Sequence, residues 1–105
     1  IRSVHNYFRP LRVTKDRAEE RAFVISEYGG LTCPVKGHTC AKEVYGYRAY
    51  ETPAAFTKAF KEQQKKLRAL ERQGLCGAVY TQVSDVEEEI NGLYTYDRKI
   101  CKIIE

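Results

Sequence analysis

The 105-residue chain has an ordinary globular composition, with 43% hydrophobic and 11% aromatic residues, which excludes a disordered protein. Its net charge of +4 comes from 18 basic and 14 acidic residues that are largely interspersed, so we expect a solvated surface and no nucleic-acid partner. No apolar run approaches the roughly 20 residues that a membrane span needs, so we also expect no membrane partner.

The start of the sequence indicates a segment of a longer protein. The first residue is Ile, and the sequence contains no Met. A complete gene product begins with Met, so we expect the natural start to lie upstream of residue 1. The chain is then one domain or part of one.

The N-terminal third contains a short strand and a charged segment. Residues 1–8, with the sequence IRSVHNYF, are expected to form a strand that carries polar groups at its end. Pro10 breaks this strand. Residues 12–21 are highly charged, and we expect one to three helical turns there.

The stretch FVISEYGG, at residues 23–30, raises the question of why a buried strand would end on a carboxylate. The apolar run predicts a strand at 22–27 that is buried on both faces, because it lacks alternation. Gly29 and Gly30 end the strand. Residues 31–51 are expected to form a long, mostly irregular loop at the strand ends, in which Tyr45, Tyr47 or Tyr50 packs on the following helix.

A helix is predicted at 53–73. Thr52 is a suitable N-cap, Pro53 is tolerated in the first turn, and Gly74 fits the position after the last turn. Apolar residues recur at helical spacing at Phe56, Phe60, Leu67 and Leu70. A second continuously apolar strand is then predicted at 75–82, and it would bury Cys76.

Two buried strands joined through a helix indicate a right-handed parallel crossover, so the fold class is α/β with three parallel strands in chain order. An open doubly wound sheet would normally carry a glycine-rich phosphate loop, and none is present. Polar residues instead follow each strand, which is typical of a (β/α)8 barrel. These residues are His5, Asn6, Tyr7, Glu27, Tyr28, Tyr80, Gln82 and Asp85.

The four cysteines leave several alternatives open: two disulfides, a metal site that includes His38, or free thiols. The segment from Cys33 to Cys40 lacks the paired two-residue spacing of common zinc motifs, so we interpret the cysteines as free thiols and expect no metal. Free thiols favour a reducing compartment, and a cytoplasmic location is preferred over export. We expect the acidic run of Asp85 and Glu87–Glu89 to be a solvated turn.

Two motifs resemble glycoside hydrolase family 2, the β-galactosidase and β-glucuronidase group. VISEYGG looks like the end of the seventh barrel strand in that family, and residues 74–99, GLCGAVYTQVSDVEEEINGLYTYDRK, are similar to the eighth strand and exit segment of bacterial members. The resemblance implies that residues 1–105 are the C-terminal segment of a catalytic barrel. It would comprise roughly the last three strand-helix units of a partial (β/α)8 TIM barrel.

The same resemblance implies a retaining β-glycosidase in which Glu27 is the nucleophile and Tyr7 is its hydrogen-bond donor. In this mechanism two carboxyl groups stand about 5 Å apart, and no metal or cofactor takes part. Tyr80 stands where many members carry a tryptophan of the sugar platform. The candidate substrate-binding residues are His5, Asn6, Tyr7, Tyr28 and Tyr80.

The general acid of the family follows an asparagine, and no Asn-Glu pair occurs in this sequence. We therefore expect the partners to be a carbohydrate substrate and the remainder of a parent chain. The isolated chain is expected to be inactive and to self-associate. Two alternatives remain open: a small α/β binding module, and a metal module built on Cys33, His38 and Cys40.

Overall fold

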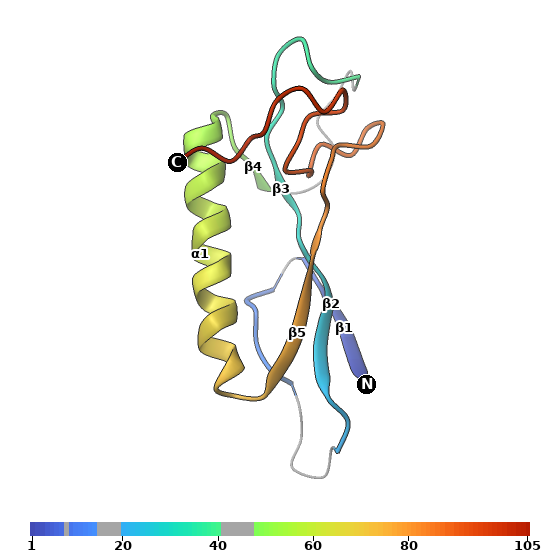
Figure 1. Ribbon diagram of the computed structural model, residues 1–105, viewed down its shortest axis with the longest axis vertical. Helices are drawn as coiled ribbons and strands as arrows, with labels where there is room; N and C mark the ends of the chain where they lie inside the picture. The colour runs from blue at the N-terminus through green and yellow to red at the C-terminus, as the bar shows by residue number, and fades with distance from the viewer. Residues whose placement is uncertain (8, 15–19, 41–47) are drawn as a thin grey trace.

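The computed structural model describes residues 1–7, 9–14, 20–40 and 48–105. Three strands form a parallel sheet in the order β1-β2-β5, and one long helix lies along one side of it (Figure 1). The elements are β1 (Arg2–Asn6), β2 (Phe23–Gly29), β3 (Leu31–Thr32), β4 (Arg48–Ala49), α1 (Pro53–Glu71) and β5 (Leu75–Thr81). The short strands β3 and β4 form a separate parallel pair.

The expected α/β fold with three parallel strands in chain order and a crossover helix is confirmed. The described strands do not close into a barrel, and both edges of the sheet are open. The helical turns expected at 12–21 are absent from the described part of that range, and residues 15–19 lie outside the described residues. Leu11 and Val13 instead pack against the core, which keeps this segment extended beside the sheet.

The helix α1 begins at Pro53, as its sequence predicts, and ends at Glu71, two residues before the predicted end at 73. The Thr52 side chain accepts a hydrogen bond from the backbone N–H of Ala55 at 3.2 Å, and Pro53 occupies the first turn. Gly74 follows the helix with φ +103°, a left-handed conformation that glycine adopts without strain. No helix in the described part of the chain is long and apolar enough to cross a membrane.

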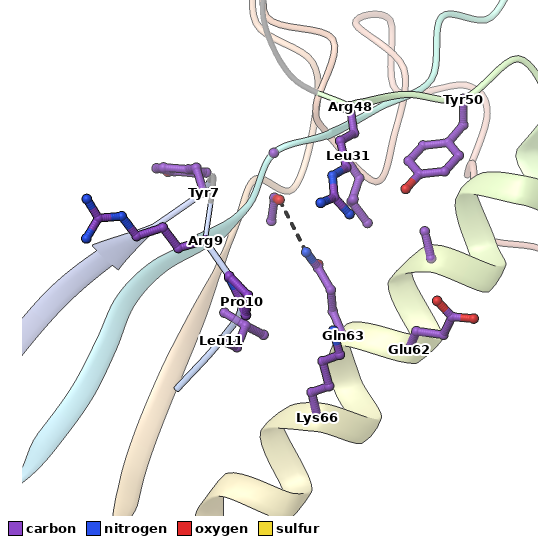
Figure 2. Close-up of a pocket in the computed structure, with 13 residues that line it drawn as sticks. Tyr7, Arg9, Pro10, Leu11, Leu31, Arg48, Tyr50, Glu62, Gln63 and Lys66 are labelled. Atoms are coloured by element: carbon purple, nitrogen blue, oxygen red, sulfur yellow. Dashed lines mark hydrogen bonds between the residues drawn. The ribbon is translucent and has the colours of Figure 1, made fainter. Parts of the chain in front are cut away.

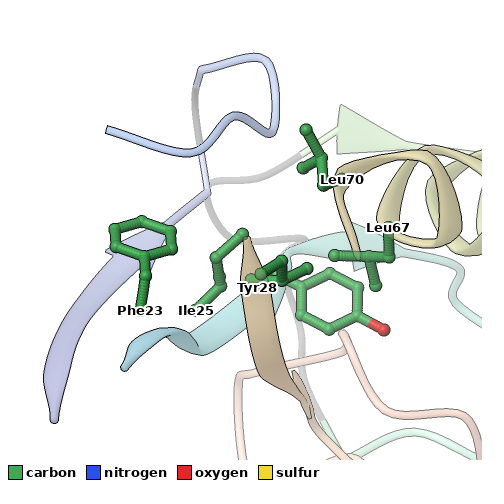
Figure 3. Packing of buried hydrophobic residues seen from close by; sticks show 6 residues of the cluster. Phe23, Ile25, Tyr28, Leu67 and Leu70 are labelled. Carbon is green, nitrogen blue, oxygen red and sulfur yellow. The ribbon is translucent and has the colours of Figure 1, made fainter. Parts of the chain in front are cut away.

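The main core lies between the sheet and the C-terminal half of α1 (Figure 3). Phe23 and Ile25 of β2 are completely buried and pack with Leu67 and Leu70 of the helix. Tyr28 joins the same cluster at the end of β2. Burial of these large side chains on one side of the sheet holds the helix against the strands.

A bulge in β2 decides which way the end of the strand faces. Val4 pairs with Ile25, whereas the next residue of β1, His5, pairs with Glu27, so Ser26 is the extra residue. The pairing with β5 shifts over the same interval. Simple alternation would place Glu27 on the side of Ile25. The extra residue places Tyr28 on that side and turns Glu27 toward the opposite face.

That opposite face of the sheet is uncovered in the described part of the chain. Val79 of β5 is 55% exposed on this face, and Cys76 of the same strand is also exposed. The expectation that β5 is buried on both faces, with Cys76 inside, is therefore wrong for this chain. The reason is that α1 packs against only one side of the sheet (Figure 1).

The C-terminal segment at 82–105 crosses the strand ends and returns beside the start of α1 (Figure 1). The ammonium of Lys102 is completely buried and lies 2.7 Å from Oδ1 of Asp85, which also accepts the Gly92 N–H. The prediction of a solvated turn is wrong for Asp85, because the carboxylate pairs with this buried cation, and correct for the exposed Glu87–Glu89.

Candidate functional site

The candidate site is the Glu27 carboxylate with a tyrosine hydroxyl and a histidine ring beside it, on the uncovered face of the sheet. Tyr7 Oη donates a hydrogen bond to Glu27 Oε2 at 2.6 Å. His5 Nδ1 lies 3.4 Å from the same oxygen. The Glu27 side chain is 39% exposed and the His5 side chain 62% exposed, so solvent reaches both groups.

Local structure explains why these side chains meet. His5 is paired with Glu27 across β1 and β2, and Tyr7 follows directly after the end of β1, so both side chains reach the same oxygen of Glu27. The bulge at Ser26 brings Glu27 to the uncovered face. Because parallel strands end at the same edge, all three groups gather at the C-terminal end of the sheet.

The chemistry available here is that of an oriented carboxylate. A bond of 2.6 Å from a hydroxyl to a carboxylate oxygen is in the short range of charge-assisted hydrogen bonds. Among the described residues, no group of three or more His, Cys, Asp or Glu could hold a metal ion. A carboxylate oriented by a hydrogen bond can act as a nucleophile or as a base.

Asn6 is placed differently from its neighbours on β1. It pairs with Tyr28, its Nδ2 donates to the carbonyl oxygen of Pro10 at 3.3 Å, and its Oδ1 is buried without a hydrogen-bond partner. The structure thus directs Asn6 toward the segment after β1. A sugar contact by Asn6 stays a prediction.

Tyr28 and Tyr80 lie on the helix side of the sheet, away from Glu27. Tyr28 Oη accepts a hydrogen bond from Gln64 Nε2 at 2.6 Å. The Tyr80 ring packs edge to face against Tyr28 and Phe60, at centroid distances of 5.3 and 5.1 Å. Burial raises the pKa of both phenols. Both rings therefore act in packing here, and their contacts with substrate stay predictions.

A partly open cavity of about 140 Å³ lies near the site, on the helix side (Figure 2). Tyr7 and Arg9 line one side of it, and Gln63 donates a hydrogen bond to the carbonyl oxygen of Gly29 at 3.3 Å across it. Glu27 is not among its lining residues. The carboxylate itself does not line the cavity, although Tyr7, which donates a hydrogen bond to it, does.

The described part of the long loop lies at the C-terminal ends of the strands, as expected (Figure 1). Tyr50 packs against the cluster that contains Phe56 of α1, which confirms the expected contact with the helix, whereas Tyr45 and Tyr47 lie outside the described residues. His38 Nδ1 lies 2.7 Å from Asp97 Oδ2, so the loop is tied to the C-terminal segment.

The carboxylate of Asp97 accepts hydrogen bonds from several groups. It accepts a hydrogen bond from Thr95 Oγ1 at 2.6 Å and another from the Lys99 N–H at 3.1 Å. The Thr95 bond first, and then His38 and the Lys99 N–H, hold the pKa of Asp97 well below its usual range. His38 is thus engaged in a loop contact.

The cysteines are all free, as expected, but only Cys33 is buried. Burial raises the pKa of the Cys33 thiol, which keeps it protonated and unreactive. Cys40 is exposed, and its Sγ donates to the carbonyl oxygen of Glu87 at 3.0 Å. Cys33, His38 and Cys40 therefore do not form a ligand group in the structure.

No protein-family model matches the sequence, and no curated protein is significantly similar to it.

Sequence reasoning missed two features of this region. The bulge at Ser26 is one, although a small polar residue inside an apolar run was a possible signal for it. The buried pair of Asp85 and Lys102 is the other, and no local pattern marks it, because its partners lie 17 residues apart.

Proposed function

We propose that the chain is the C-terminal part of the catalytic barrel of a retaining β-glycosidase, similar to glycoside hydrolase family 2, and that Glu27 is its nucleophile. The observation that carries this proposal is the 2.6 Å hydrogen bond from Tyr7 to Glu27 on the accessible face, at the C-terminal ends of two parallel strands. An ionised carboxylate only accepts hydrogen bonds, and so it matches the donors around it.

The uncovered face supports completion of the sheet into a barrel. Parallel sheets occur almost only with both faces covered. Here the face that carries Glu27 also carries Val24, half-buried, and Val79, 55% exposed, and both sheet edges are open. In a barrel these side chains would fill the interior and Glu27 would lie at its catalytic end.

The reaction then proceeds in two displacements. Glu27 attacks the anomeric carbon, the glycosidic C–O bond breaks, and the leaving oxygen takes a proton from a carboxylic acid supplied by the rest of the barrel. Water next attacks the same carbon, the bond to Glu27 breaks, and the proton of the water returns to the second carboxylate. The substrate class is a β-glycoside.

The test uses the full-length chain that contains this segment. Glu27→Gln is nearly isosteric but cannot form the ester intermediate, so we expect turnover to fall by several orders of magnitude while folding and sugar binding persist. Glu88→Gln, on an exposed side chain, is the matched control and should be fully active.

Chemical rescue distinguishes a nucleophile from a binding residue. With azide, Glu27→Ala should yield a glycosyl azide of inverted configuration, because the small anion takes the place of the missing carboxylate. Normal turnover by Glu27→Gln would contradict the proposal.

A further inference from the structure

We infer, on the basis of the proposed function, that His5 is a positioning residue for Glu27. Together with Tyr7 it holds Oε2 of the carboxylate, so that Oε1 is the oxygen that attacks the sugar. It also assists the later release of the sugar from the enzyme. The residue is thereby assigned to the carboxylate and not to a sugar hydroxyl.

The geometry points to this role because both side chains approach one oxygen, Tyr7 through a hydrogen bond and His5 at ion-pair distance. Tyr7 Oη lies 2.6 Å and His5 Nδ1 3.4 Å from Glu27 Oε2. No described residue forms a hydrogen bond with Oε1. The hydrogen bond from Tyr7 engages Oε2, so Oε1 forms the bond to the anomeric carbon. Oε2 becomes the carbonyl oxygen of the ester.

The backbone fixes His5 in place. His5 and Glu27 are direct partners in the parallel pairing of β1 and β2, so the distance between their Cα atoms cannot change without disrupting the sheet. The distance of 3.4 Å is longer than an optimal hydrogen bond. Catalytic hydrogen bonds are often long in the free enzyme and tighten as the reaction proceeds. The imidazole is 62% exposed and has room for this adjustment.

The two halves of the reaction place opposite demands on these donors. In the first half the carboxylate loses negative charge as Oε1 bonds to carbon, so donors on Oε2 give no advantage. In the second half water bonds to the carbon, the Oε1–carbon bond breaks, and its electron pair returns to the carboxylate. The charge that reappears on Oε2 is stabilised by Tyr7 and by the N–H of His5.

The expected signature of His5→Leu therefore lies in deglycosylation. In the full-length chain, with an aryl β-glycoside that it turns over and that has an activated leaving group, kcat should fall roughly 10- to 100-fold, the effect of one hydrogen bond to a charged group. KM should fall in proportion, so that kcat/KM stays within about threefold. A pre-steady-state burst of the aryl alcohol should appear as the intermediate accumulates.

Two amide variants test the position of the donor. Asn places its amide near the position of Nδ1, whereas Gln places its amide near Nε2, so His5→Asn should restore most of kcat and His5→Gln should not. Ser3→Ala, on the exposed side chain two residues earlier on the same side of β1, is the control and should be unchanged.

Three results would overturn the role. These are an unchanged kcat in His5→Leu, a raised KM at constant kcat, which would indicate a sugar ligand, and equal activity of the Asn and Gln variants. If His5→Leu is unaffected while Glu27→Gln is inactive, only the inference about His5 fails. If both variants turn over normally, the proposed function fails as well.

Discussion

The two faces of the sheet differ in what covers them. On the helix side, Phe23 and Ile25 are completely buried and Tyr28 is 3% exposed. On the other side, Val79 is 55% exposed, and the side chains of His5 and Glu27 are open to solvent. Because Val24 of β2 and Val79 of β5 also lie on the open face, the contrast shows that burial here is decided by the element that covers a face.

The closed side is reinforced by the C-terminal segment. Lys102 lies completely buried, pairs with Asp85 and stands 5.8 Å from the centre of the Phe56 ring on α1. The carbonyl oxygen of Lys102 accepts a hydrogen bond from Thr57 on the same helix. Polar contacts thus extend the packed layer on the helix side, whereas the side that carries Glu27 lacks an equivalent cover among the described residues.

The largest effect should come from breaking this buried pair. Asp85→Ala leaves the Lys102 ammonium buried without its partner, so we expect the free energy of unfolding to fall by about 3–5 kcal/mol. Lys102→Met should also destabilise the fold, because it leaves the buried Asp85 carboxylate without its cation. Urea denaturation measures both, with Glu88→Ala as an exposed control. A loss below about 1 kcal/mol in Asp85→Ala would show that the closed side does not depend on this pair.

Neighbouring residues of β2 allow a matched comparison of the two faces. Ile25→Ala creates a cavity on the closed side and should cost about 2–5 kcal/mol. Val24→Ala, on the half-buried open side, should cost less than about 1 kcal/mol, because water already reaches the face. Thermal or urea unfolding of the two variants gives the difference. Equal losses would mean that the faces are equally covered in solution.

Most of the fold was predictable because the strong signals are local. The helix boundaries follow from Thr52, Pro53 and Gly74, and the strands follow from apolar runs between breakers. Burial was less predictable. An apolar strand favours packing on both of its faces, but its sequence does not show whether another element packs on each face. Cys76 illustrates this: its strand was predicted correctly, yet its side chain is exposed.

The candidate site was predictable in part. Tyr7 was expected to donate to Glu27, and the structure has this bond at 2.6 Å. Tyr28 and Tyr80 were grouped with the same strand ends, but the bulge at Ser26 separates the directions of Glu27 and Tyr28. A bulge changes direction through backbone pairing with neighbouring strands, which the residues of one strand do not specify.

Smaller effects are expected from the phenols of the closed side. Tyr80 Oη is buried without a hydrogen-bond partner, so Tyr80→Phe should change the free energy of unfolding by about 1 kcal/mol or less, and in the stabilising direction. Tyr28→Phe should destabilise by about 0.5–1.5 kcal/mol, because it removes the acceptor of Gln64. Urea denaturation at neutral pH compares them. Strong destabilisation by Tyr80→Phe would indicate a partner for that hydroxyl.

The difference in stability between the wild type and Tyr80→Phe should depend on pH in a defined direction. Burial raises the pKa of Tyr80 above its ordinary value of 10.0, so the folded state disfavours the phenolate. The contribution of this group is present below pH 10 and is lost as the pH rises further, since the unfolded chain ionises first. Unfolding of the wild type should therefore become easier above pH 10 more steeply than unfolding of Tyr80→Phe. Parallel curves would contradict the burial of this phenol.

The open face should show the smallest change in stability and a change in association. We expect the isolated 105-residue chain to self-associate through its uncovered strands, as a dimer formed by edge pairing or exchange of elements. Val79→Lys should alter stability by no more than about 0.5 kcal/mol, because the side chain is exposed, yet weaken this association. Light scattering of the wild-type chain and of Val79→Lys measures the association of each. A monodisperse wild-type monomer would contradict the expected self-association.

Covalent trapping of the intermediate tests the central claim, that Glu27 is a glycosidase nucleophile, most directly. A 2-deoxy-2-fluoro glycoside with an activated leaving group slows hydrolysis of the glycosyl-enzyme, so the ester persists long enough for peptide mapping by mass spectrometry. In the full-length chain we expect one sugar per active site, attached to the peptide that contains Glu27, and no label in Glu27→Gln. A label on another carboxylate, or complete turnover of ordinary substrate without any label, would contradict the account.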